Sequence, residues 1–341
     1  MGIVTGLAAM VWAAAGAAFE VEEVTVFAGR ADGATLDILS TTDTEAFAPL
    51  IEAFQAQNPD VTINYTVANS QEVYAAIYDE GAAFDLVVSS AMDLQMKLAN
   101  DGFGRSHASD ATERLPDWAR WSDQLFAFAQ EPVVLIANRA AFADMPLPRT
   151  RDDLIRLMRE YPERFRGRIG TYDPNLSGAG YLFATQDARQ SDTIWRLAEV
   201  MGGLDPALFG SSGAMIDGVR SGELTLAYNV VGSYAAARLG QDGAGVVIEA
   251  EDFTHVLLRT ALIPRTAQAP EGGAAFLDFL LSEDGQHLIE AETGLPRINE
   301  AALAASPHLR PIRLDLGLLV FVDPLMRQRF LSEWTAAVLQ P

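Results

Sequence analysis

The sequence contains no cysteine and only one lysine, Lys97, among its 341 residues. Without cysteine, disulfides, thiol nucleophiles, zinc ribbons and iron–sulfur clusters are all excluded. Because Leu98 follows Lys97, the chain has no Gly-Lys-Ser/Thr phosphate-binding loop, and a Schiff-base lysine would have to be Lys97 itself. These absences remove thiol chemistry and the lysine-dependent phosphate loop from consideration.

Basic residues are also scarce, because 24 Lys and Arg face 46 Asp and Glu, giving a formal net charge of −22. Proteins that bind nucleic acid use a basic surface to displace counterions from phosphates, so we expect no nucleic-acid partner. Docking on an anionic membrane surface is disfavoured for the same reason. Apolar residues make up 49% of the chain, as in a globular protein. The length is enough for two domains of about 100–200 residues each.

An apolar run at residues 3–18 ends in small residues, including Gly16 and Ala18. A membrane span needs about 20 apolar residues, so this run is short for one. Acidic sequence follows at once, which is typical of a secretory signal peptide cleaved before Phe19. Met1 and Gly2 provide no basic n-region, so either the true start lies upstream or the run is a buried helix that imitates a signal. We expect residues 1–18 to be a signal peptide and the mature protein to be soluble and periplasmic.

Segments with strand and helix periodicity alternate after residue 34, whereas residues 19–34 show no clear period and are expected to form a loose leader. Alternation predicts strands at 35–40, 61–65 and 84–88. Between them, helices are predicted at 72–80 and around the apolar positions Phe47, Leu50, Ile51 and Phe54. Capping boxes are predicted at 42–45 and 90–93. This β-α-β-α-β order predicts a parallel sheet with helices on both faces.

The pattern starts afresh after an apolar strand at 133–137. Helices are predicted at 152–158, around Ile194, at 215–220 and at 232–239, and strands at 169–172 and 224–228. Two α/β lobes explain this order better than one long sheet.

Three predicted strand-to-helix junctions are rich in small hydroxyl residues: 40–44, 89–90 and 177–180. In open α/β sheets, ligands bind beyond the carboxyl ends of the strands, where helices begin. Free N–H groups and a partial positive charge at a helix start form an anion site without any lysine. The alternative is that these residues only cap helices, since Ser, Thr and Asp are preferred caps.

Two segments resemble a known family. Leu36-Asp37-Ile38-Leu39-Ser40-Thr41-Thr42-Asp43, with Asn58-Pro59-Asp60-Val61 after the next helix, looks like the opening of an ABC-importer substrate-binding protein. Residues 274–286, AAFLDFLLSEDGQ, resemble the F-x-x-F-L-L-S-x-E-G-Q helix of ferric-binding and related extracytoplasmic proteins, with Asp284 where Glu is usual. Residues 85–98 and 170–189 look most like the phosphoglycerate-regulatory and sugar-phosphate branch. The resemblance covers roughly residues 35–300.

The resemblance implies a periplasmic-binding-protein type II fold, with two α/β lobes, a hinge and a ligand cleft between the lobes. The first lobe would comprise 35–134 and 262–341, and the second 135–261. The implied function is to clamp a small anionic solute, phosphorylated or carboxylated, and to deliver it to an ABC permease in the inner membrane. The chain would act as a monomer, without enzymatic activity, cofactor or metal. The implied contacts are Thr41, Thr42, Asp43, Ser89 and Ser90 of the first lobe, and Ser177, Gly178, Tyr228, Asn229 and Ser233 of the second.

Two alternatives keep the clamp. Phosphoglycerate-regulatory relatives imply a periplasmic sensor that reports to a membrane histidine kinase. Ferric members resemble one another in an adjacent tyrosine pair, but the matching helix start here is Gly232-Ser233-Tyr234-Ala235, with one tyrosine replaced by serine. That departure argues against iron, although Tyr228 and Tyr234 keep it open as an alternative. Arg105 and Arg238 are candidate cationic partners of an anionic ligand.

Other constellations give weaker signals. Glu249, Glu251, Asp252 and His255 form an acidic cluster that would suit a divalent cation, but a solvated loop is the plainer interpretation. Asp252 facing the cleft is a third interpretation. The four histidines lack zinc-site spacing, so a zinc enzyme has no support. An exported hydrolase that uses paired carboxylates stays as a remote alternative, since 46 acidic residues always offer a pair.

Overall fold

The computed structural model describes residues 19–30, 33–239 and 243–340. The expected signal peptide, residues 1–18, lies outside the described residues. The strands of the described residues are β1 (Glu23–Phe27), β2 (Thr35–Ser40), β3 (Thr62–Val67), β4 (Leu86–Ser89), β5 (Arg120–Trp121), β6 (Leu125–Asn138), β7 (Ile169–Tyr172), β8 (Ala207–Phe209), β9 (Leu226–Val231), β10 (Gly245–Ile248), β11 (Thr254–Leu262) and β12 (Leu309–Pro311).

The helices alternate with these strands. They are α1 (Thr44–Gln57), α2 (Ser70–Tyr78), α3 (Met92–Asn100), α4 (Asp110–Glu113), α5 (Arg151–Glu160), α6 (Pro162–Phe165), α7 (Gly178–Gln190), α8 (Thr193–Gly202), α9 (Ser212–Ser221), α10 (Gly232–Leu239), α11 (Pro270–Leu281), α12 (Glu283–Glu292), α13 (Glu300–Ala305) and α14 (Pro324–Val338), with 3-10 turns η1 (Asp117–Ala119) and η2 (Leu316–Leu319). Among the described helices, none is long and apolar enough to cross a membrane.

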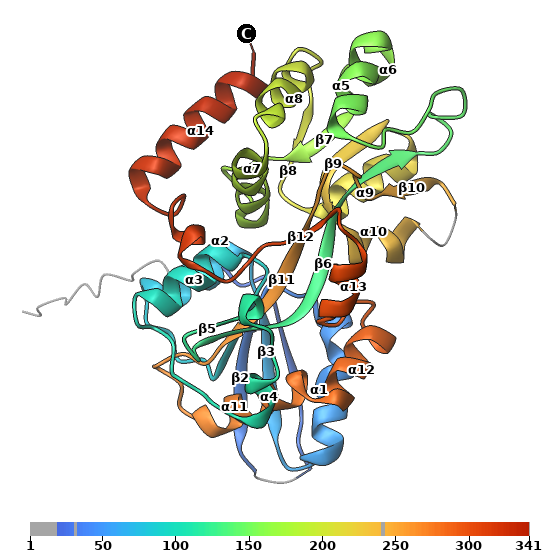
Figure 1. Ribbon diagram of the computed structural model, residues 1–341. Helices are drawn as coiled ribbons and strands as arrows, with labels where there is room; N and C mark the ends of the chain where they lie inside the picture. The colour runs from blue at the N-terminus through green and yellow to red at the C-terminus, as the bar shows by residue number, and fades with distance from the viewer. Residues whose placement is uncertain (1–18, 31–32, 240–242, 341) are drawn as a thin grey trace, which may run out of the picture.

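Two α/β lobes lie one above the other in Figure 1. The lower group, called the first lobe here, contains β2, β3 and β4 with α1, α11 and α12 beside them. The upper group, the second lobe, contains β7, β8 and β9 with α5, α7 and α8. Two long strands, β6 and β11, run between the groups. The expected two-lobed α/β architecture is confirmed.

The sheet of the first lobe follows the sequence prediction. Strand β2 pairs in parallel with both β3 and β4, as the β-α-β-α-β pattern predicts. The predicted loose leader is wrong in part, because residues 23–27 form β1, which pairs antiparallel with β3. The side chains of Val24 and Val26 stay exposed, so backbone hydrogen bonds to β3, rather than burial of an apolar face, hold this edge strand.

The hinge is formed by β6 and β11. Residues 125–132 of β6 pair with β11, whereas 133–138 pair with β9 and β10 of the second lobe. The predicted strand at 133–137 is therefore only the second half of a longer strand that crosses between the lobes. The change of partner falls at Pro132, which has no N–H to donate to a ladder.

Aromatic packing fills the core of the first lobe. Phe47, Leu50, Ile51 and Phe54 are buried, as their helical spacing predicts. The ring of Phe54 lies 4.8 Å, centroid to centroid, from that of Phe276 on α11. The helix that carries the resemblance motif thus covers the same face of the sheet as α1.

The carboxyl-terminal helix α14 packs on the other lobe. Its Phe330 ring lies 5.7 Å from the ring of Trp195 on α8, and Figure 1 shows α14 beside α7 and α8. The predicted lobe boundaries, 35–134 with 262–341 and 135–261, stay a prediction. Within that division, α14 crosses back from the segment assigned to the first lobe.

Both predicted capping boxes are absent. Helix α1 begins after Asp43 and α3 after Ala91, and neither residue caps its helix through a side-chain hydrogen bond. The physical reason at α1 is competition, because the hydroxyl of Thr42 accepts a hydrogen bond from Arg259 instead. At α3, alanine occupies the cap position and has no side-chain acceptor.

Candidate ligand-binding cleft

A cleft of about 390 Å³ lies between the lobes. Small polar residues supply most of its wall. The first lobe contributes Glu22, Thr41, Asp43, Ala68, Asn69, Ser70 and Ser90. The second lobe contributes Tyr172, Leu176, Ser177, Ala179, Gly210, Ser211, Ser212, Gly213, Val231, Tyr234 and Arg238, and β11 contributes Arg259.

The amino termini of α1, α2, α7, α9 and α10 converge on this cleft, because their cap or first-turn residues line it, and Ser90, just before the cap of α3, lines it as well. Ser177 accepts a hydrogen bond from the N–H of Gly180 at 3.1 Å, and Ser211 caps α9 in the same way. The remaining free N–H groups and the helix dipoles give the cleft a partial positive charge. The arrangement suits an anion.

Arg259 supplies a full positive charge at the cleft. Its guanidinium donates to the Oε1 atom of Glu131 at 2.5 Å, to the hydroxyl of Thr42 at 2.6 Å and to the phenol oxygen of Tyr234 at 3.2 Å. Burial alone would lower the pKa of Arg259, but the Glu131 carboxylate and the Tyr234 phenol together outweigh burial and raise it. The side chain therefore stays charged although it is only 2% exposed.

The two lobes touch at the mouth of the cleft. A Cβ atom added to Gly178, at the start of α7, would lie 2.4 Å from the hydroxyl oxygen of Ser70 on α2. The hydroxyl of Ser233 on α10 also donates to Glu131 on the hinge strand β6. The close approach of Gly178 and Ser70 describes a closed arrangement of the lobes, in which a side chain at 178 would have to displace the Ser70 hydroxyl.

The structure places four of the ten predicted contact residues on the wall of the cleft. Thr41, Asp43, Ser90 and Ser177 line the cleft. Thr42 and Ser89 are buried, and Thr42 contacts the guanidinium of Arg259. Of the two guessed cations, Arg238 lines the cleft and Arg105 does not.

Tyr228 and Asn229 lie elsewhere, in a buried ion network inside the second lobe. Asp187 accepts hydrogen bonds from the phenol of Tyr228 at 2.9 Å and from the amide of Asn229 at 2.7 Å. Arg151 donates to the phenol oxygen of Tyr228 at 2.7 Å. Because both predicted side chains take part in this network, neither Tyr228 nor Asn229 lines the cleft.

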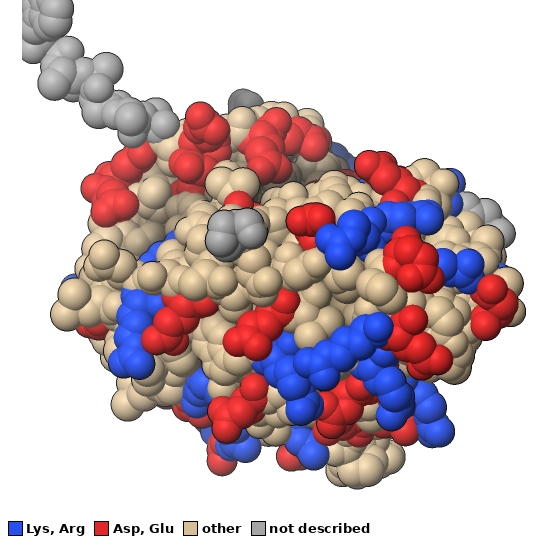
Figure 2. Space-filling view, turned by 90° about the horizontal axis from the view of Figure 1, so that it is seen from above, with Lys and Arg blue, Asp and Glu red and all other residues tan. Residues whose placement is uncertain are grey.

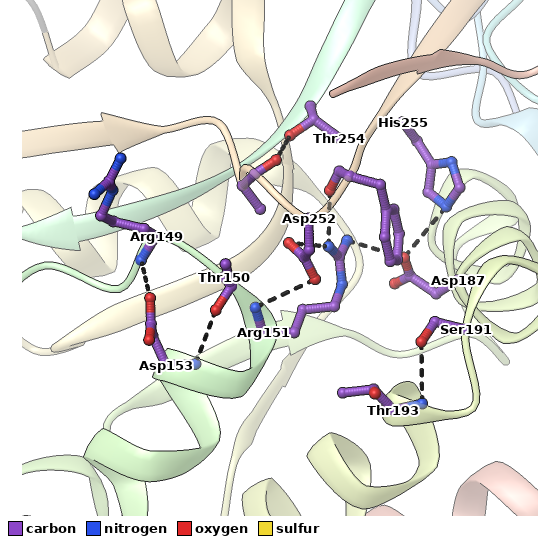
Figure 3. A network of polar contacts seen from close by, with 12 residues as sticks. Arg149, Thr150, Arg151, Asp153, Asp187, Ser191, Thr193, Asp252, Thr254 and His255 are labelled. Carbon is purple, nitrogen blue, oxygen red and sulfur yellow. Dashed lines mark hydrogen bonds and ion pairs between the residues drawn. The ribbon is translucent and has the colours of Figure 1, made fainter. Parts of the chain in front are cut away.

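Figure 3 shows the centre of this network, with Arg151 between Asp252 and Asp187, and His255 beyond Asp187. The guanidinium lies 3.2 Å from a carboxylate oxygen of each aspartate. Burial would raise the pKa of Asp187, but Arg151 and His255 lower it.

The acidic residues of the cluster at 249–255 each lie next to a cationic partner. Asp252 faces Arg151 instead of the cleft, Glu251 pairs with Arg149, and Glu249 pairs with His308. No group of His, Asp and Glu suited to a metal ion occurs in the described ranges.

Several cleft residues escaped the sequence analysis. Asn69 and Ser70 follow strand β3 and open α2, so the reasoning used for the other junctions would have found them. Ser211 and Ser212 open α9 in the same way. Arg259 also left a signal, because it is the single charge in the apolar stretch 256–263.

The family of bacterial extracellular solute-binding proteins matches residues 36–293. The chain belongs to this family. Among solved structures, a crystal structure of the substrate-binding protein of an ABC transporter from Agrobacterium tumefaciens is 32% identical, with a TM-score of 0.88 over 93% of this chain and 98% of that one. No curated protein sequence matches the chain.

More distant solute-binding proteins share the fold. AfuA from Actinobacillus pleuropneumoniae, solved with fructose-6-phosphate bound, is 16% identical with a TM-score of 0.72, covering 91% of this chain and 100% of that one. Iron-bound HitA from Pseudomonas aeruginosa is 18% identical with a TM-score of 0.68, covering 89% and 99%. The family match and the 32% identical structure confirm the expected resemblance to substrate-binding proteins of ABC importers. Solute-binding proteins of this kind bind small molecules and deliver them to an ABC permease.

Proposed function

We propose that the chain is an exported, periplasmic solute-binding protein that clamps a small organic anion, phosphorylated or carboxylated, and presents it to an inner-membrane ABC permease. The observation that carries this proposal is the convergence of helix amino termini and Arg259 on one interlobe cleft. Contacts from both lobes to one ligand stabilise the closed form, so binding shifts the equilibrium between open and closed molecules.

The residues that line the cleft favour an organic anion that also carries hydroxyl groups over a bare inorganic ion. Arg259 and Arg238 line the cleft and would bind an oxyanion there, while the carboxylates of Asp43 and Glu22 line the same cleft. A carboxylate repels an anion but accepts hydrogen bonds from ligand hydroxyls. AfuA, whose structure contains fructose-6-phosphate, shares the fold and supports this class of ligand.

The two cleft tyrosines are poorly placed for ferric ion. The phenol oxygen of Tyr234 accepts a hydrogen bond from Arg259, and that of Tyr172 lies 2.5 Å from the hydroxyl of Ser212. Burial raises the pKa of Tyr172, which opposes formation of a phenolate ligand. Tyr228 is held in the Asp187 network. Ferric ion is therefore the competing ligand that the experiment below includes.

A thermal-shift panel on residues 19–341 tests the proposal. It contains phosphoglycerates, hexose phosphates, inorganic phosphate, di- and tricarboxylates, and ferric ion with a weak chelator. A ligand at 100 times its dissociation constant adds about 2.7 kcal/mol of stability, a shift of several degrees at roughly 2–4 °C per kcal/mol. A shift with organic anions supports the proposal, and a shift with ferric ion alone overturns it.

Two variants decide whether the shift comes from this cleft. Ser90→Tyr fills the wall between the lobes and should abolish the shift. Ser332→Tyr adds the same bulk to an exposed position on α14, outside the cleft, and should retain it. Equal shifts in both variants would place the ligand elsewhere. Capture of the permease rather than a histidine-kinase ectodomain by the loaded protein separates delivery from a sensor role.

A further inference from the structure

A second recess, of about 370 Å³, lies at the far end of helix α7 from the ligand cleft. The 13 residues of α7 span about 20 Å. Ser177, at its amino terminus, lines the cleft, whereas Gln186, Arg189 and Gln190 line the recess. The other walls are His255 and the segment 310–313 with Asp315.

Three arginines lie on this recess without a carboxylate partner. Within the described part of the chain, Arg189, Arg310 and Arg313 form no ion pair, and the hydrogen bonds of Arg189 and Arg310 go to neutral oxygens of Gln186, Gly317, Pro307 and Leu309. Elsewhere in the second lobe, Arg139 and Arg168 donate to backbone carbonyls and also lack an ion pair among the described residues. Other arginines there are paired, as Arg156 is with Asp153 and Arg196 with Asp152. On the face seen in Figure 2, basic and acidic side chains lie next to each other in this way. The distinguishing feature of the recess is that three such guanidinium groups line one concave surface in a chain of net charge −22.

The acidic groups near the recess have other partners. Asp315 accepts the N–H of Gly317 at 2.7 Å, where it begins η2. Behind the wall, Asp187 lies 3.3 Å from the Nε2 atom of His255 and is compensated by Arg151. The carboxyl end of α7 and Asp315 oppose an anion, so net attraction requires more than one of the three arginines.

We propose that this recess binds a polyvalent oxyanion such as a phosphate-bearing small molecule, at a site separate from the transport ligand. A guanidinium group donates two parallel hydrogen bonds to a phosphate, so three such groups, one on α7 and two on the segment 310–313, suit several charged oxygens.

An anion held there bridges the second lobe to the hinge. Arg189 belongs to α7, whereas Arg310 and Arg313 lie on the segment 309–314, which begins with β12 beside β11 and contacts the first lobe. In that segment the N–H of Ile312 donates to the carbonyl of Val256 on β11 at 2.9 Å, and the N–H of Leu314 donates to that of Trp118 at 3.0 Å. The occupied recess thus joins elements on both sides of the hinge.

Calorimetric titration of the full chain with inorganic pyrophosphate tests the site. We expect Arg189→Gln/Arg313→Gln to weaken binding at least tenfold. The matched control, Arg105→Gln/Arg114→Gln, removes the same charge at exposed positions of the first lobe and should stay within twofold of the unmodified chain. All the substituted side chains are exposed, and unfolding curves verify that both variants fold.

Three outcomes overturn the proposal. The first is that the unmodified chain does not bind pyrophosphate, and the second is that the two double variants weaken binding equally. The third is that Arg238→Gln abolishes binding while the recess variant retains it, which would place pyrophosphate in the ligand cleft. A tungstate peak at the recess in anomalous scattering from soaked crystals, together with tenfold weakening in the recess variant only, supports it.

Discussion

The Nε atom of Arg259 donates to the Oε1 atom of Glu131 at 2.5 Å and so joins the two strands that connect the lobes. The side chains are 2% and 0% exposed. Through further hydrogen bonds, this one ion pair reaches Thr42 in the first lobe and Ser233 and Tyr234 in the second. It therefore affects both the stability of the fold and the closing of the cleft.

Breaking this pair should be costly. Arg259→Met leaves the carboxylate of Glu131 buried without its cation, and we expect the free energy of unfolding to fall by about 3–5 kcal/mol. Glu131→Gln combined with Arg259→Met removes the stranded charge and should recover most of that loss. Urea denaturation measures both. If the double variant is less stable than Arg259→Met, the loss does not come from the stranded carboxylate.

Gly178 should control closure. In Gly178→Val the new side chain meets Ser70 of the opposite lobe, so the lobes stay apart. We expect a larger radius of gyration in X-ray scattering and at least tenfold weaker binding of any cleft ligand, because closing a cleft depends on such close approach. Gly210→Val is the control, since a Cβ atom at Gly210 meets nothing within 4 Å although the residue also lines the cleft. Restoration of closure by adding Ser70→Gly would assign the effect to this contact.

Local patterns predicted the elements better than they predicted the site. Periodicity gave the bounds of 35–40 and 232–239 as the structure has them, because apolar side chains on one face decide both. The hydroxyl-rich junctions at 40–44 and 89–90 converged as expected, since β2 and β4 are parallel strands that end at the same edge of a sheet, and the junction at 177–180 faces them from the other lobe. Tyr228 was misplaced because nothing local shows that Arg151 and Asp187, far away in sequence, occupy its phenol. Arg259 was missed because its partners come from both lobes.

The buried network of the second lobe should dominate that lobe's stability. Arg151→Met leaves Asp187 buried and short of its main cation, and we expect a loss of about 3–5 kcal/mol in the free energy of unfolding. Arg149→Met, two residues away, breaks an exposed pair with Glu251 and should cost less than about 1 kcal/mol. Guanidinium denaturation of the two variants measures the difference. Equal losses would contradict the assigned role of the network.

The buried Asp93 should make the folded protein more stable at low pH than at neutral pH. A carboxylate held in an ion pair has the opposite effect. Burial raises its pKa to about 6, although the backbone N–H of Leu94 donates to its Oδ1 atom at 2.9 Å and Arg327 lies near enough to oppose the shift. The pKa in the unfolded chain is about 3.9, so between these values the folded protein binds more protons than the unfolded one. Stability is therefore greatest below about pH 4 for this group and is lost as the pH rises through about 6.

Two pKa units correspond to about 3 kcal/mol, so Asp93→Asn, whose amide oxygen still accepts from Leu94, should stabilise the protein by roughly 1–3 kcal/mol at pH 7. At pH 4 it should have little effect, because the unmodified carboxyl is then protonated in the fold. Urea midpoints at pH 4, 5, 6 and 7 measure this difference. Asp110→Asn, at an exposed position, should change the free energy of unfolding by less than about 0.5 kcal/mol throughout. A gain from Asp93→Asn that does not grow between pH 4 and 7 would show that a packing change, rather than a buried charge, accounts for it.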